Sequence, residues 1–266
     1  MRRELFPPGD ELCGFLDRIK EVPDDDAPRL VLADYLEEHG HPERGELVRR
    51  QCEAARLAAA GQDAWQAERR VRDLLTDSAE RWLAPWAKWL GFERRRFVRG
   101  LVDLSLPVAD LCRIEAVVPD HARSAAWVER LTAAEVEDPA AAAALLRTTV
   151  AGKVVALKVT GYRATAETIR DIVREVAASP VLGQLRELEL TFREFTAGAA
   201  AALAGSRTLA RLAHLTLEYA AVDDAAAEIL ADPRCLPSLT SVRVNGWRLS
   251  PEAVGRLRAR FSDARV

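Results

Sequence analysis

A short apolar pattern that returns at a nearly constant interval is the feature of this chain that most constrains its fold. The segments LRELEL, LAHLTL and LTSVRV each close on an apolar-x-apolar triplet. These triplets begin at Leu188, Leu215 and Val242, which are 27 residues apart on both steps. Repeats of this length are typical of stacked solenoids, in which each unit contributes one short parallel strand and buries its apolar side against its neighbours.

Earlier segments extend the repeat. The triplet also begins at Leu104 and Leu157, with a degenerate candidate at Leu131, so the spacings from Leu104 onward are 27, 26, 31, 27 and 27 residues. The return segments have helical periodicity, as in residues 165–179, where Thr165 can cap a helix. We therefore predict an α/β fold with about six units over residues 93–266, with parallel strands on a concave side and helices on a convex side.

The first 92 residues carry no such repeat and predict a helical module. Apolar spacing favours one helix over 10–21, a second from Pro28 to Gly40, a third from about Glu43, and a longer one from Asp63 that ends before Pro85. The spacing of Trp82, Trp86 and Trp89 forms one apolar stripe, which we interpret as packing that caps the repeats rather than as a ligand platform. The predicted domains are residues 1–92 and 93–266.

Composition excludes several classes of function. The chain has 38 basic and 41 acidic side chains, so no overall field favours nucleic acid or anionic membrane as a partner. The four cysteines form no CxxC pair, and no segment resembles a signal peptide or a membrane span. We expect a cytoplasmic protein with no cofactor, no metal and no membrane association, which is a monomer in isolation.

Two resemblances agree with this division. Residues 97–261 resemble degenerate leucine-rich repeats of the ribonuclease-inhibitor-like type. Residues 15–51 resemble the bacterial repeat-companion domain, a helical module that typically precedes such repeats. The resemblance implies an architecture of module plus repeats and no defined enzymatic activity. The positions that match the module are Phe15, Leu16, Ile19, Pro23, Asp25, Arg29, Leu30, Ala33, Asp34, Leu36, Glu37, Arg44, Glu46, Arg49 and Gln51.

The polar residues between the triplet leucines are the candidate binding residues. Side chains alternate along a strand, so if the leucines point inward, these residues line the concave sheet. The sequence therefore predicts a partner-binding surface made of Lys158, Thr160, Glu187, Glu189, Thr191, His214, Thr216, Glu218, Ser241, Arg243 and Asn245. Three glutamates on this surface favour a protein partner with a basic patch.

Three other interpretations compete with this one. The arginine cluster at 94–99 could make the chain a nucleic-acid adaptor, although the basic track stops after Arg99. His214 beside glutamates could support acid–base catalysis, although an open sheet excludes water poorly. The acids at 24–26 could hold a hard cation, but acids before a helix also stabilise its N-terminus. We expect instead that Asp34, Arg29 and Arg49 tie helices together.

These observations predict a regulatory or scaffolding protein that binds or sequesters a protein partner through the concave face of its repeats. We expect no catalytic activity, and nucleic acid is the less favoured partner.

Overall fold

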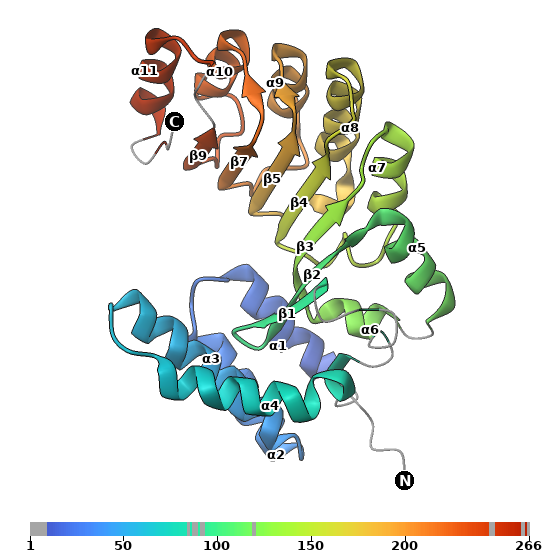
Figure 1. Cartoon of the computed structure of the whole chain (residues 1–266), viewed down its shortest axis with the longest axis vertical. Helices are drawn as coiled ribbons and strands as arrows, with labels where there is room; N and C mark the ends of the chain where they lie inside the picture. The colour runs from blue at the N-terminus through green and yellow to red at the C-terminus, as the bar shows by residue number, and fades with distance from the viewer. Residues whose placement is uncertain are drawn as a thin grey trace. The chain divides into compact units, whose positions relative to one another are not determined.

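The computed structural model describes residues 10–83, 86, 90, 94–118, 121–244, 248–261 and 264. The chain divides into two units, which are described separately. Unit 1 comprises Met1–Leu104 and Val118–Glu129, and unit 2 comprises Ser105–Val117 and Arg130–Val266. The chain is an α/β protein with a mostly parallel sheet that is not closed (Figure 1).

Unit 1 is mostly helical, and the helices predicted before Pro85 are confirmed. Helix α1 buries Leu12, Leu16 and Ile19 on one face, and α2 and α3 each begin with a proline in the first turn, where a missing N–H costs no hydrogen bond. Gly40, with φ of +83°, follows α2. Helix α2 packs against α3, and α3 against α4. The bounds are α1 (Asp10–Glu21), α2 (Ala27–Glu38), α3 (Pro42–Ala59), α4 (Trp65–Leu83) and α6 (His121–Ala126).

The tryptophan stripe lies inside unit 1 as far as it is described. Trp82 and Trp86 are buried, and the ring of Trp82 meets Phe97 edge-on at a centroid distance of 6.0 Å. Trp89 lies outside the described residues. The two described tryptophans are therefore core residues and do not form an exposed platform.

A β-hairpin in unit 1 was not predicted. Strand β1 (Arg95–Val98) pairs antiparallel with β2 (Leu101–Pro107), and Val98 lies opposite Leu101. The two residues between them, Arg99 and Gly100, both have positive φ, at 44° and 90°. This is the conformation of the tight two-residue turns that match strand twist, so the Arg-Gly pair was the overlooked signal.

The predicted boundary at residues 92 and 93 therefore differs from the division seen in the structure. The hairpin belongs to unit 1 up to Leu104, and so does the stretch Val118–Glu129. The physical reason is a set of hydrogen bonds. Gln51 on α3 donates to the carbonyl of Phe97 at 2.5 Å and accepts from the amide of Gly100 at 2.8 Å.

Unit 2 alternates strands with helices. Strands β3, β4, β5, β7 and β9 are parallel and side by side, and helices α7–α11 form a second row (Figure 1). Leu131, Leu157, Leu188, Leu215 and Val242 lie in register and are buried, so even the degenerate triplet forms a strand. The bounds are α5 (Val108–Val117), β3 (Val128–Ala134), α7 (Pro139–Leu146), β4 (Ala156–Gly161), α8 (Ala166–Ala178), η2 (Pro180–Leu182), β5 (Glu187–Phe192), β6 (Glu194–Phe195), α9 (Ala197–Ala204), β7 (His214–Glu218), β8 (Ala221–Val222), α10 (Asp224–Ala231), β9 (Ser241–Val244) and α11 (Pro251–Arg260).

Four helices of unit 2 begin at a capping side chain, whereas Thr196 before α9 makes no side-chain cap hydrogen bond. Thr165 caps α8, as predicted. Ser250 caps α11, and Pro251 occupies the first turn of that helix. Asp138 and Asp223 cap α7 and α10 in the same way. In the described part of the chain, we find no helix with the length and apolar character needed to cross a bilayer.

Candidate partner-binding face

Register places the predicted polar residues on one side of the sheet in rows across the strands. We call this surface the polar face. Its first row joins Glu187, His214 and Ser241. The second row joins Lys158, Glu189, Thr216 and Arg243, and the third joins Thr160, Thr191 and Glu218. The apolar residues between these rows are buried, so the strand alternation predicted from sequence is confirmed.

Ion pairs between strands organise the charges of the polar face. Arg130 Nη1 donates to Glu187 Oε2 at 2.8 Å. Lys158 Nζ contacts Glu189 Oε1 and also donates to Glu218 Oε2 at 3.2 Å. Each of the three glutamates is therefore engaged by a cation of the same sheet.

The pKa values of Lys158 and Glu218 reflect this cluster. Burial alone would lower the pKa of Lys158, but hydrogen bonds to Glu189 and Glu218 raise it above its ordinary 10.5. Hydrogen bonding with Glu189, and then with Lys158, lowers the pKa of Glu218 below 4.5. The cluster therefore stabilises the fold fully between pH 4.5 and pH 10.5, which are the ordinary pKa values of the glutamate and lysine side chains. This stabilisation is lost as pH falls through the lowered pKa of Glu218 or rises through the raised pKa of Lys158.

Two of the predicted surface residues are buried. Thr160 and Thr191 are 9% and 0% exposed, so the prediction that their side chains line the accessible surface of the sheet is wrong. Thr191 lies on β5, and the Lys158–Glu218 pair joins the two strands on either side of it.

The part of the polar face on β7 and β9 is more exposed. His214 and Arg243 are exposed, and Thr216 and Ser241 are half-buried. Asn245, the last predicted binding residue, lies outside the described residues. His214 lies opposite Glu187 and Ser241 in register, on an accessible strand end.

Sequence reasoning missed Arg130. Its repeat, Leu131-Thr132-Ala133, is degenerate, so the polar positions of β3 were not included in the predicted surface. In the structure Arg130 pairs in register with Ala156 and reaches Glu187 on the next strand but one. The signal was the 27-residue spacing from Leu104 to Leu131.

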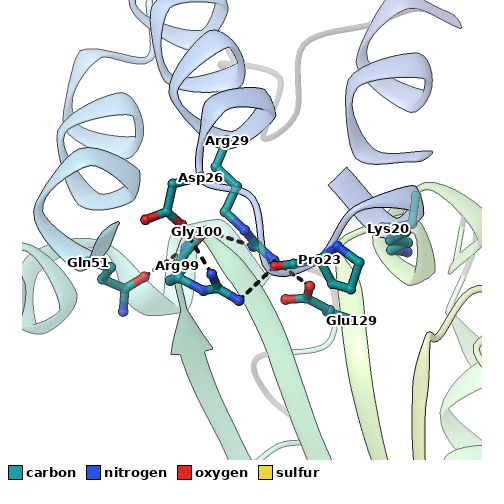
Figure 2. A network of polar contacts seen from close by, with 9 residues as sticks. Lys20, Pro23, Asp26, Arg29, Gln51, Arg99, Gly100 and Glu129 are labelled. Atoms are coloured by element: carbon teal, nitrogen blue, oxygen red, sulfur yellow. Dashed lines mark hydrogen bonds and ion pairs between the residues drawn. The ribbon is translucent and has the colours of Figure 1, made fainter. Parts of the chain in front are cut away.

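A second polar cluster lies inside unit 1 (Figure 2). The buried Arg29 donates to the carbonyls of Pro23 at 3.0 Å and Arg99 at 3.1 Å, and it also contacts Glu129. Arg99 donates to Pro23 at 2.7 Å and to Asp26 at 3.1 Å. This cluster joins the start of α2 to the hairpin turn and to β3, and it fixes unit 1 internally.

The predicted ties between helices are partly confirmed. Arg49 on α3 donates to Asp34 at 2.6 Å and Glu37 at 2.7 Å on α2. The hydrogen bond to Asp34 has the largest effect on the pKa of Arg49, which it raises, and the hydrogen bond to Glu37 raises this pKa further. Arg29 does not join that tie, because its acidic partner is Glu129.

The structure gives structural roles to residues of the two competing sites, the acids at 24–26 and the arginine cluster at 94–99. Asp25 caps the amide of Ala27 at 2.9 Å and Asp26 pairs with Arg99, so two of the three clustered acids have structural partners. Within the described residues, no group of three or more His, Cys, Asp or Glu side chains could hold a metal ion. In the arginine cluster, Arg95 is buried and Arg99 is ion-paired.

Comparison with protein-family models and with curated protein sequences returned no match.

Proposed function

We propose that this protein binds a protein partner through the polar face of unit 2. The observation that carries the proposal is the accessible row of polar side chains across β3, β4, β5, β7 and β9, held by ion pairs between strands. A surface ordered in this way loses little conformational entropy on binding, which favours recognition of a folded partner.

We also propose that the repeats form a short leucine-rich-repeat-like solenoid, with the polar face on its concave side and the helices on its convex side. In-register buried leucines and the sequential packing of α7, α8, α9, α10 and α11 support this architecture. On this proposal, residues 1–92 form the repeat-companion module that precedes the repeats.

The chemistry of the partner follows from the charge pattern. Glu187, Glu189 and Glu218 alone would favour a basic patch on the partner. Arg130 and Lys158 already form ion pairs with these glutamates. The partner would therefore meet a surface on which positive and negative side chains alternate, and not a purely acidic one. We therefore propose a partner surface of mixed charge, whose basic groups meet Glu187 and Glu218 and whose acidic groups meet Arg243 and His214.

The test uses charge substitutions at His214 and Arg243, two exposed residues of the face. The bait His214→Glu/Arg243→Glu should recover at least about tenfold less partner than the wild-type bait, because it places like charges opposite the partner's acidic groups. Recovery is measured by quantitative mass spectrometry of proteins captured from cells that express the chain naturally.

The matched control is Arg258→Glu/Ala259→Glu on α11, which changes two exposed residues and alters the net charge by the same amount. This bait should capture the partner as the wild type does. Equal recovery by both double variants and the wild type, with unchanged melting temperatures, would rule out the polar face as the binding surface.

A further inference from the structure

The ends of β4, β5 and β7 carry an exposed aromatic and basic cluster that the sequence analysis did not single out. Tyr162 and Tyr219 are 53% and 66% exposed, which is unusual for such large side chains. Arg163 and Arg193 are exposed beside them. We call these four residues the tyrosine rim. Tyr162, Arg193 and Tyr219 directly follow β4, β5 and β7, and neighbouring strands are about 4.8 Å apart, so the strands that lead to the two tyrosines lie on either side of the strand that leads to Arg193.

The backbone of the rim is strained at Tyr219. Tyr219 has φ of +58°, a conformation that bulky residues rarely adopt and that persists only where the surroundings enforce it. The turn that follows is fixed because the amide of Ala221 donates to the carbonyl of Arg193 at 2.9 Å, and β6 pairs with β8 immediately beyond. The exposed tyrosine ring is thus presented by a rigid turn.

Two carboxylates near the rim accept hydrogen bonds from backbone amides. Glu137 accepts from the amide of Arg163 at 2.8 Å, and Asp223 accepts from Ala226 at 2.7 Å and Ala197 at 3.4 Å. Glu194 is half-buried, and Glu135 is exposed at the end of β3, where the basic stretch stops. Among the described residues, no side chain forms an ion pair or hydrogen bond with the guanidinium group of Arg163 or of Arg193, so both groups are available to an anionic ligand.

We propose that the tyrosine rim binds an acidic, extended peptide segment of the partner protein. Arginine can form two parallel hydrogen bonds with a carboxylate, and tyrosine and arginine are the residue types that most often dominate binding energy at protein interfaces. This inference rests on the proposed function, because it assigns the segment to the same partner that covers the polar face.

An acidic peptide fits this surface better than a nucleic acid does. Phosphate chains need a basic track that continues over several nucleotides. Here Glu218 precedes Tyr219 directly, and Glu187 and Glu189 lie further along the same face. These carboxylates would repel a phosphate backbone that continued beyond the rim, whereas a peptide can place its acidic residues at the two arginines alone.

The first experiment measures binding by fluorescence polarisation with four labelled probes. Three are ten-residue peptides with the same leucines and with glutamate, glutamine or lysine at the remaining positions, and the fourth is a ten-nucleotide oligothymidine. The wild-type chain should bind the glutamate peptide at least about tenfold more tightly than each other probe. Equal binding of the three peptides, or tighter binding of the oligonucleotide, would overturn the proposal.

Three variants locate the binding. Arg193→Glu and Tyr219→Gly should each weaken binding of the glutamate peptide about tenfold or more. Glycine accepts positive φ, so Tyr219→Gly should fold at least as stably as the wild type, which separates lost binding from misfolding. Arg211→Glu, at an exposed arginine before β7, should leave the affinity within twofold. Rim variants that bind like the wild type would also overturn the proposal.

Partner capture with the same baits separates this inference from the proposed function. If His214→Glu/Arg243→Glu loses the partner while Arg193→Glu and Tyr219→Gly retain it, the polar face stands and the rim proposal fails. If only the rim variants lose the partner, the polar face is the wrong surface.

Discussion

At the scale of single residues, Arg29 is the side chain on which unit 1 depends most. It is fully buried, and removing it leaves Glu129 and the carbonyl of Arg99 without this donor, while the carbonyl of Pro23 keeps only its bond from Arg99. Breaking a buried ion pair from one side costs about 3–5 kcal/mol. We therefore expect Arg29→Ala to lower the free energy of unfolding by that amount, measured by urea denaturation.

The control is Arg49→Ala, which breaks a partly exposed tie to Asp34 and Glu37. Exposed ion pairs contribute about 1 kcal/mol or less, so this variant should remain close to the wild type. Similar losses in the two variants would contradict the role given to burial.

The thiols provide a second test at the residue scale. Burial, followed by the charge of Asp26, raises the pKa of Cys52 to about 12, and burial also raises the pKa values of Cys112 and Cys235. A raised pKa depletes the reactive thiolate at pH 8. Cys13 is exposed, so the native protein should show one fast thiol with a colorimetric disulfide reagent, and four after denaturation. A fast reaction of Cys52 in the native state would refute its burial.

At the scale of elements, the β1–β2 hairpin depends on Gly100. Its φ is +90°, and an added Cβ would lie 2.5 Å from a methyl carbon of Val48. Gly100→Ala should therefore cost at least about 1 kcal/mol of stability. Gly14→Ala is the matched control, because a Cβ there meets nothing within 4 Å on helix α1, and alanine favours a helix by about 0.5–1 kcal/mol. Equal melting temperatures for the two variants would contradict the account of the turn.

Elements with local signals were predictable, and features that depend on distant residues were not. The helices of unit 1 follow from apolar spacing, and the strands of unit 2 follow from the repeated triplets. The burial of Thr191 was missed because strand alternation alone places this residue on the polar face. The Lys158–Glu218 ion pair joins residues 60 apart. The Arg29–Glu129 contact joins residues 100 apart, and no pattern in the local sequence indicates it.

At the scale of the whole molecule, the charges nearly cancel, with 38 basic and 41 acidic side chains. Long-range attraction is therefore weak, and recognition has to come from local patterns of charge and shape. The polar face and the tyrosine rim are the two such patterns identified in unit 2. The central claim is that a protein partner covers the polar face, and that the helices of the second row stay accessible.

Carboxyl labelling of the chain with and without its bound partner tests that claim most directly. Glu187 and Glu218 on the polar face and Glu228 on α10 all have side chains that are exposed enough to be labelled, at 37%, 43% and 63%. We predict that the partner protects Glu187 and Glu218 from a carbodiimide reagent and leaves Glu228 unchanged, as read by mass spectrometry. Protection of Glu228 with full labelling of Glu187 and Glu218 would contradict the account.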